Sequence, residues 1–212
     1  MRSTAAPEAD LESLRKTAQI LVIDDMAFPS QKLFERDGYH IQRWPRVKNL
    51  SQLTDGYFDV ILLDVQGVGL DESPDLQGLG ILQAIKRVNP AQVVILYSAG
   101  SWRLTTRSYT ALADEVLDKE ASYIDYKDVV DRLLLRRASP GYYVAVMNGV
   151  LGSSAASAPR AVAKALRALR SGNSEPLRRY LVSRLKDKDE IDRVLTVVSI
   201  GATALQLAGV GG

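Results

Sequence analysis

Residues 19–25 read QILVIDD, a run of branched apolar side chains that ends in two aspartates. The same pattern returns at residues 60–64, VILLD, and at residues 93–98, VVILYS, which end in a serine. Nearly continuous apolar runs of this length are typical of strands covered by helices on both faces of a parallel sheet. We therefore predict that these three segments are strands of one parallel sheet.

Two further strands and five helices are predicted around these runs. Residues 39–44 are mixed in polarity, which indicates an edge strand, and residues 116–118 form a short fifth strand. The predicted helices are 30–37, 49–53, 79–88, 103–113 and 124–135. Strands that alternate with helices in this way predict an α/β doubly wound domain with right-handed crossovers. The pattern alone does not give the order of the strands in the sheet.

The pattern changes after Arg137, where Ser139-Pro140-Gly141 is a break signal. Beyond it the strand pattern does not continue, and residues 142–151 fit a helix or a strand, of which we favour the helix. The helices predicted in this part are 142–151, 161–169, 176–185 and 191–207. We therefore divide the chain into an N-terminal extension at 1–18, an α/β domain at 19–137 and an all-α C-terminal module at 138–212.

Composition narrows the classes of function. The chain has 212 residues, of which 46% are hydrophobic and 25% charged, as in ordinary soluble domains. It has no cysteine and one histidine, His40, which excludes disulfides, cysteine nucleophiles and zinc sites built from cysteine or clustered histidine. We expect no signal peptide from the polar start, and no membrane span from the longest uncharged run, 194–212, because polar residues dilute it. The lack of cysteine fits a cytoplasmic protein.

Polar side chains follow the predicted strands at the edge where parallel strands end. Asp24 and Asp25 close the first strand, Asp64 closes the third, Ser98 closes the fourth and Lys119 follows the fifth. Ligands of doubly wound sheets bind outside the carboxyl ends of the strands. If the first and third strands are neighbours, three carboxylates converge there, and their repulsion calls for a hard cation such as Mg²⁺. A hydroxyl and an ammonium on the same edge are suited to receive phosphoryl oxygens.

In this register, residues 19–137 resemble the receiver domain of response regulators in two-component signal transduction systems. The resemblance is carried by Asp24-Asp25 after LVI, Asp64 after ILL, Ser98-Ala99 after VVILY and Lys119 after VLD. It covers slightly over half of the chain. It implies a flavodoxin-like five-stranded parallel sheet with strand order 2-1-3-4-5.

The resemblance also implies a reaction, in which Asp64 accepts a phosphoryl group from a phosphohistidine of a histidine kinase or phosphotransfer protein. The implied Mg²⁺ ligands are Asp24, Asp25, Asp64 and the backbone carbonyl of Gln66. The implied phosphoryl-binding and switch residues are Ser98, Ala99 and Lys119. Such a protein catalyses at most its own phosphorylation and dephosphorylation and is not a metabolic enzyme. Taken singly, Asp24 also fits a helix N-cap, Ser98 a strand-end hydroxyl and Lys119 a surface lysine.

Three features depart from the family pattern. An acidic loop at residues 65–77 replaces the usual short segment, with its proline, that follows the acceptor. This loop either gates access or contacts a partner, or it is a tolerated surface insertion. Glu120 stands where the family has a proline, and Val116 stands where it has an aromatic switch residue. The usual coupling between Ser98 and an aromatic side chain is therefore in question.

The C-terminal module leaves its partner open. Residues 141–212 contain 10 lysines and arginines against 5 acidic residues, whereas residues 1–140 contain 17 against 20. The apolar faces of 142–151 and 191–207 favour a protein partner or a homodimer through the C-terminal helices. The basic charge makes nucleic acid the alternative, although no helix-turn-helix is recognised and solvated helix faces show similar spacing. Contact with a membrane surface and an enzymatic output are less favoured still.

Overall fold

The computed structural model describes residues 9–99 and 107–210. The chain divides into two compact units. One consists of Arg15–Leu134, and the other combines the described parts of Met1–Leu14 and Leu135–Gly212.

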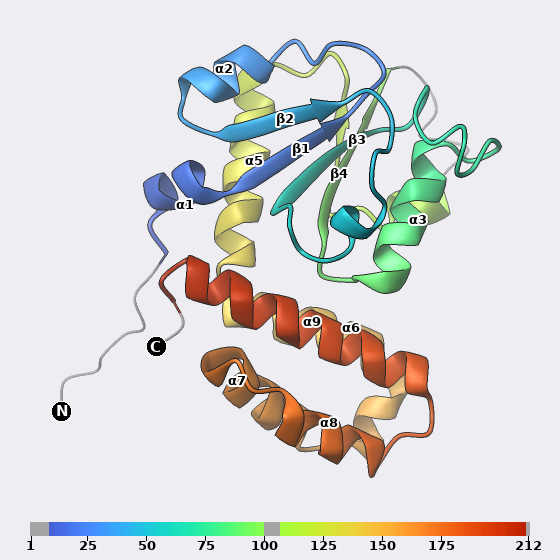
Figure 1. Ribbon diagram of the computed structural model, residues 1–212, viewed down its shortest axis with the longest axis vertical. Coiled ribbons are helices and arrows are strands. Elements are labelled where there is room, and N and C mark those ends of the chain that lie inside the picture. The colour runs from blue at the N-terminus through green and yellow to red at the C-terminus, as the bar shows by residue number, and fades with distance from the viewer. Residues whose placement is uncertain (1–8, 100–106, 211–212) are drawn as a thin grey trace. The chain divides into compact units, whose positions relative to one another are not determined.

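A five-stranded parallel sheet forms the centre of the first unit, with the order β2-β1-β3-β4-β5 (Figure 1). Its strands are β1 (Gln19–Ile23), β2 (His40–Trp44), β3 (Val60–Asp64), β4 (Val93–Ser98) and β5 (Glu115–Asp118). The strand order implied by the resemblance is confirmed, and β2 lies at an edge, as its mixed polarity indicated. Strands β3 and β4 are buried along their whole lengths, which explains their unbroken apolar runs.

Each face of the sheet is covered by a different set of side chains. On one face, Leu21, Ile61 and Leu63 pack in one cluster with Ile81 and Ile85 of α3 (Gly78–Val88). The opposite face carries an aromatic cluster of Phe28, Tyr97 and Tyr126, the last from α5 (Tyr123–Arg137). Figure 1 shows α3 and α5 on different sides of the strands. The sheet is thus covered on both faces, as the apolar runs predicted.

The remaining helices of this region are short. They are α1 (Leu11–Thr17), α2 (Gln31–Arg36), the 3₁₀ turn η1 (Ser51–Leu53) and α4 (Arg107–Thr110). The predicted helix at 103–113 begins outside the described residues and is helical within them only over α4. Helix α1 was not predicted, because Leu14 is its one buried side chain and no apolar periodicity marks it. Its start is held by Asp10, whose Oδ2 accepts a hydrogen bond from the Ser13 N–H at 3.1 Å.

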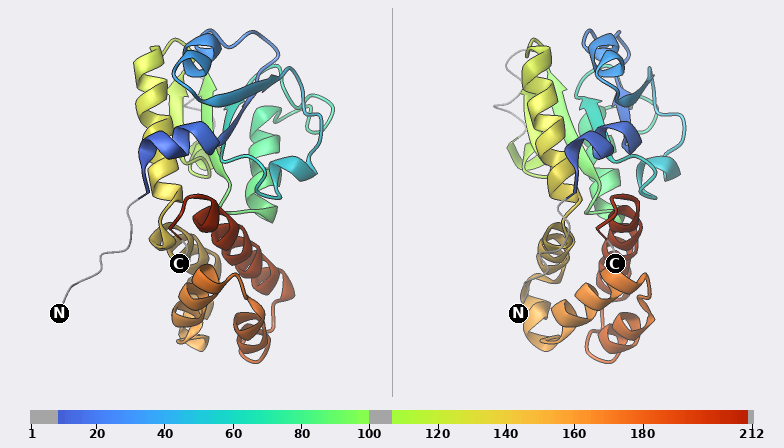
Figure 2. Two further views of the ribbon diagram at one scale, coloured as in Figure 1. Left: turned by 60° about the vertical axis from the view of Figure 1, so that its left-hand side comes forward. Right: turned by 90° about the vertical axis from the view of Figure 1, so that its left-hand side faces the viewer.

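The second unit is helical, as predicted. Its elements are α6 (Pro140–Leu151), the 3₁₀ turn η3 (Gly152–Ser157), α7 (Ala161–Ser171), α8 (Glu175–Val182) and α9 (Lys188–Leu207) (Figure 2). Helix α6, only weakly favoured by the sequence, begins where Ser139 Oγ accepts from the Gly141 N–H at 3.2 Å, with a proline in its first turn. A Cβ at Gly201 of α9 would lie 2.6 Å from both Tyr143 and Leu169, so α6, α7 and α9 share one tightly packed core.

This core includes the apolar faces that had favoured self-association. In α6 the buried residues are Tyr143, Met147 and Leu151, and in α9 they include Val194 and Val198. The unit uses these faces for its own packing, so they are not free for assembly, and a homodimer through the C-terminal helices stays a prediction. Within the described residues, no helix is long and apolar enough to cross a membrane.

Candidate functional site

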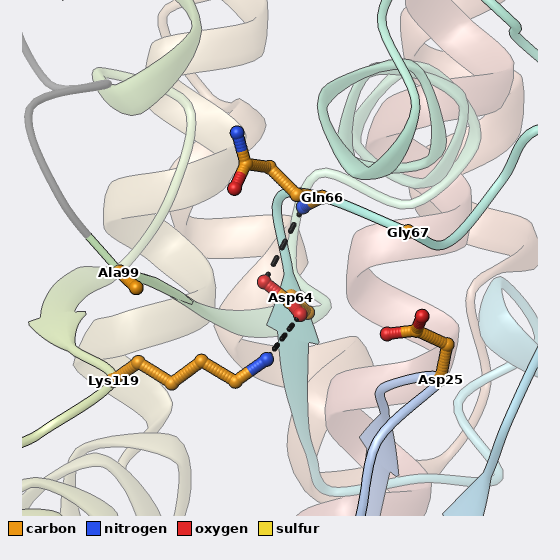
Figure 3. A pocket seen from close by; sticks show the side chains of 6 residues that line it. All are labelled: Asp25, Asp64, Gln66, Gly67, Ala99 and Lys119. Carbon is orange, nitrogen blue, oxygen red and sulfur yellow. Dashed lines mark hydrogen bonds and ion pairs between the residues drawn. The ribbon is translucent and has the colours of Figure 1, made fainter.

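The parallel register brings the predicted acids to one edge of the sheet. Ile23 pairs with Leu63 across β1 and β3, so Asp24 and Asp64 follow neighbouring strands at the same level. One carboxylate oxygen from each of Asp24, Asp25 and Asp64 lies within 4.8 Å of the others. An open cavity of about 200 Å³ adjoins Asp25 and Asp64 (Figure 3). It is lined by Asp25, Asp64, Gln66, Gly67, Ala99 and Lys119.

Asp64 is buried and contacts a lysine. Its Oδ2 accepts a hydrogen bond from Lys119 Nζ at 2.6 Å, and its Oδ1 accepts from the Gln66 N–H at 3.3 Å (Figure 3). Burial raises the pKa of Asp64 above its ordinary value, and these two hydrogen bonds offset that rise only in part. The Asp64 carboxylate is thus a poorly solvated acid that faces an open cavity, which is a suitable arrangement for a nucleophile.

Lys119 provides the positive charge of the site. Its backbone N–H donates to the Ser98 carbonyl at 3.1 Å, which holds the end of β5 beside the end of β4. Partial burial lowers the pKa of Lys119, but the hydrogen bond and charge of Asp64 outweigh it, so this pKa lies above its usual value. The side chain therefore stays an ammonium at neutral pH, and it is paired with Asp64 at 2.6 Å rather than surrounded by solvent.

The two adjacent aspartates differ in environment. Asp24 is fully buried, and its Oδ1 accepts from the Met26 N–H at 2.8 Å while its Oδ2 accepts from the Tyr97 hydroxyl at 2.7 Å. Asp25 is exposed, and its carboxylate points toward Asp64 in Figure 3. No N–H or O–H within residues 9–99 and 107–210 donates to the Asp25 carboxylate. This acid is therefore free for a ligand in the cavity.

The donor set fits a hard divalent cation. Three carboxylates with mutually close oxygens face one ammonium, Lys119, so the cluster carries excess negative charge. Mg²⁺ takes a few carboxylates with water and phosphate oxygens, which this open cavity allows. Gln66 lines the same cavity, and the use of its backbone carbonyl as a ligand stays a prediction.

Ser98 and Ala99 lie at the end of β4, beside the cavity. The Ser98 hydroxyl is buried and has no hydrogen-bond partner within the described part of the chain. A buried hydroxyl without a partner is unfavourable, and such groups are commonly satisfied by a ligand or an ordered water. Ala99 lines the cavity directly. The phosphoryl-binding role that the resemblance implies for both residues stays a prediction.

The acidic loop is an ordered part of this edge. Val68 is buried in the core cluster and Leu76 packs against it, whereas Asp71, Glu72 and Asp75 are exposed. The loop thus presents its charges to solvent while its apolar side chains fix its course.

Sequence reasoning missed several residues that shape the site. A Cβ at Gly67 would lie 2.7 Å from the Asp25 carboxylate, and one at Gly78 would lie 2.0 Å from the Asp64 carbonyl oxygen. From β2, Arg43 Nη1 donates to the carbonyls of Asp24 at 2.8 Å and of Met26 at 3.0 Å. No spacing of residues in the sequence predicts these contacts, because each depends on how distant segments approach in three dimensions.

No protein-family model matches the chain, and no curated protein matches it. Among solved structures, the chain is similar to a CheY-like response regulator receiver domain protein from Methanospirillum hungatei JF-1, at 20% identity and a TM-score of 0.45 over 55% of this chain and 93% of that one. A receiver domain protein from Clostridium thermocellum matches at 25% identity and a TM-score of 0.47 over 57% and 96%. The receiver domain of NtrX from Brucella abortus matches at 23% identity and a TM-score of 0.47, over 55% of this chain and 98% of that one. These three solved structures are receiver domains.

Proposed function

We propose that the unit Arg15–Leu134 is a receiver that accepts a phosphoryl group on Asp64 from a phosphohistidine of a histidine kinase or phosphotransfer protein. One observation carries the proposal: the buried Asp64 carboxylate lies 2.6 Å from Lys119 Nζ, beside two further carboxylates and an open cavity. Such a partner implies that the protein works in the cytoplasm as part of a two-component phosphorelay.

In this reaction an Asp64 carboxylate oxygen forms a bond to phosphorus while the bond between phosphorus and the histidine nitrogen breaks. The electron pair of that bond leaves with the nitrogen, and the product on the protein is an aspartyl phosphate. Bound Mg²⁺ supplies neutralisation of the phosphoryl charge. Lys119 binds a phosphoryl oxygen as its contact with Asp64 is lost, and the unpaired Ser98 hydroxyl donates to another.

The proposal is tested by intact mass after incubation with acetyl phosphate and Mg²⁺. We expect the wild type to gain one phosphoryl group and Asp64→Asn to gain none. Asp75→Asn is the matched control, because Asp75 is an exposed acid of the adjacent loop. A wild type that gains no phosphoryl group contradicts the proposal, and so does an Asp64→Asn variant that still gains one.

The C-terminal unit, on this proposal, is the output module and acts through a protein partner or a homodimer. With the faces of α6 and α9 buried, the surface that supports this role includes Val182, 60% exposed, and Leu207, 77% exposed. We expect the molar mass in light scattering to rise after phosphorylation. An unchanged mass for the wild type with phosphorylated Asp64 contradicts homodimerisation and leaves a different protein as the partner.

Helix α7 supports nucleic acid as a second candidate partner. The helix and its cap residue contain four cations and no acid, and Arg160, Lys164 and Arg167 line a hollow of about 310 Å³. Lys164 and Arg184 also lie over the ring of Tyr180, at 5.4 and 5.9 Å from its centroid. Like charges at these spacings destabilise a helix slightly, and a polyanion relieves that repulsion.

Fluorescence anisotropy with a duplex DNA tests this candidate. If four cations contact phosphates, log Kd changes with log salt concentration with a slope of about 3 to 4 in magnitude. Replacing Lys164 and Arg167 by alanine lowers that slope by about 2. Absence of binding at low salt excludes nucleic acid as the partner.

A further inference from the structure

Tyr97 of β4 joins the aromatic cluster to the acidic site. Its side chain is 0% exposed, and its ring lies 5.9 Å from that of Phe28 and 6.0 Å from that of Tyr126. The ring therefore belongs to the core, yet its hydroxyl ends 2.7 Å from Oδ2 of Asp24. A phenylalanine would fill the same space, so the packing alone does not explain why a tyrosine stands here.

The hydroxyl of Tyr97 acts as a donor. Its O–H donates to Asp24 Oδ2, because a carboxylate oxygen only accepts. A buried hydroxyl needs a hydrogen-bond partner, and the Asp24 carboxylate is the one it has. The Met26 N–H holds the other oxygen of Asp24 at 2.8 Å. With a donor on each oxygen, the carboxylate cannot rotate freely.

We propose that Tyr97 is a positioning residue, which fixes the Asp24 carboxylate and so sets the affinity of the acidic site for a divalent cation. The proposal rests on the proposed function, since it concerns the same site. Donors that hold metal-binding carboxylates in place change metal affinity by about 10- to 100-fold when they are removed. Tyr97 acts through Asp24, because it does not itself line the cavity.

The chain contains a matched control. Tyr126 is equally buried, 1% exposed, and belongs to the same aromatic cluster. Its hydroxyl donates to the backbone carbonyl of Asp118 at 3.0 Å, which is not one of the clustered carboxylates. Tyr97→Phe and Tyr126→Phe each remove one buried hydroxyl and keep the ring, so the two variants differ in whether a clustered acid loses its donor.

The test is calorimetric titration of the metal-free protein with Mg²⁺. We expect Tyr97→Phe to raise the Kd for Mg²⁺ at least about 10-fold and Tyr126→Phe to leave it within about twofold of the wild type. An unchanged Kd in Tyr97→Phe overturns the inference alone, and so does an equal rise in both variants. A wild type that does not bind Mg²⁺ overturns the proposed function, and this inference with it.

A second readout separates positioning from a merely structural role. In Tyr97→Phe, the phosphorylation rate should reach half its maximum at a higher Mg²⁺ concentration, with the maximum itself unchanged. A lower maximum at an unchanged half-saturating concentration contradicts positioning. If Tyr97→Phe does not fold, we measure instead the NMR resonance of the Tyr97 hydroxyl proton in the wild type. That resonance shifts on addition of Mg²⁺ if the inference holds and stays in place if it does not.

Discussion

The unit Arg15–Leu134 and the C-terminal helical unit bury different kinds of side chain. In the first, Asp24, Asp64 and Ser98 are buried at one edge of the sheet, and Asp131 is buried on α5. In the second, the buried residues are almost all apolar or small, and Arg137 is the one charged side chain buried within its described part. The remaining charges of that unit lie in intermediate or exposed positions.

The difference in buried charge distinguishes the first unit, which has a candidate site inside its fold, from the second, most of whose charges lie on its surface. A buried charge lowers the stability of the fold unless it is paired, so a cluster of them persists where chemistry uses it. The candidate site of the first unit therefore lies inside the fold, where small displacements of a side chain change its contacts. Any function of the second unit depends on the molecules that its exposed residues bind. Its buried side chains contribute to the stability of the fold.

The largest effect that we expect is on the unfolding free energy, and it differs between two glycines, one in each unit. A Cβ at Gly78 would lie 2.0 Å from the Asp64 carbonyl, whereas nothing lies within 4 Å of a Cβ at Gly149 in α6. We expect Gly78→Ala to lower the unfolding free energy by about 3 kcal/mol or more, since backbone must move. Gly149→Ala should raise it by up to about 1 kcal/mol, because alanine favours a helix. Urea unfolding followed by circular dichroism measures both, and equal effects would break the comparison.

The next effect concerns a buried acid outside the cavity. Asp131 accepts hydrogen bonds from Arg15 Nε at 3.0 Å, from the Tyr39 hydroxyl and from Lys127 Nζ at 3.2 Å. Burial alone would raise the pKa of Asp131, but these donors and the charge of Arg15 outweigh it, so the pKa is lowered. Asp131→Asn should cost about 2 kcal/mol at neutral pH, as hydrogen bonds to a charged group are lost.

The pH dependence of Asp131 follows from that direction. A carboxyl with a lowered pKa in the folded state contributes stability above its unfolded pKa, and that stability is lost as the pH falls through the folded pKa. The difference between the wild type and Asp131→Asn should therefore shrink below about pH 4. Thermal melts between pH 3 and 7 measure it, and a difference that grows on acidification contradicts this assignment.

A third prediction separates stability from function at the site itself. Because burial raises the pKa of Asp64, its ionised form is unfavourable in the folded protein. Asp64→Asn should abolish phosphorylation yet raise the unfolding free energy by about 1 kcal/mol at neutral pH, as is common when a functional charge is removed. Chemical denaturation measures the stability. A loss of stability would mean that the contact with Lys119 stabilises the fold more than burial of Asp64 destabilises it.

The sequence predicted the site better than it predicted the contacts that hold it. Since parallel strands end at one edge, the convergence of Asp24, Asp25 and Asp64 was foreseeable once β1 and β3 were taken as neighbours. The hydrogen bond from Tyr97 was not, because an unbroken apolar strand gives no sign of which face each side chain takes. In the helical unit, periodicity located the helices but could not say that α6, α7 and α9 cover one another.

The smallest expected effect tests whether the charged exterior of the helical unit contributes to its stability. Arg178 and Asp192 approach to 4.0 Å, with 56% and 69% of their side chains exposed. Such a pair is screened by solvent and salt, so Asp192→Asn should change the unfolding free energy by less than about 0.5 kcal/mol. Differential scanning calorimetry of the wild type and the variant at two salt concentrations checks this. A larger loss that salt does not diminish would show that this unit, too, depends on specific charges, and the contrast with the site around Asp64 would then be one of degree.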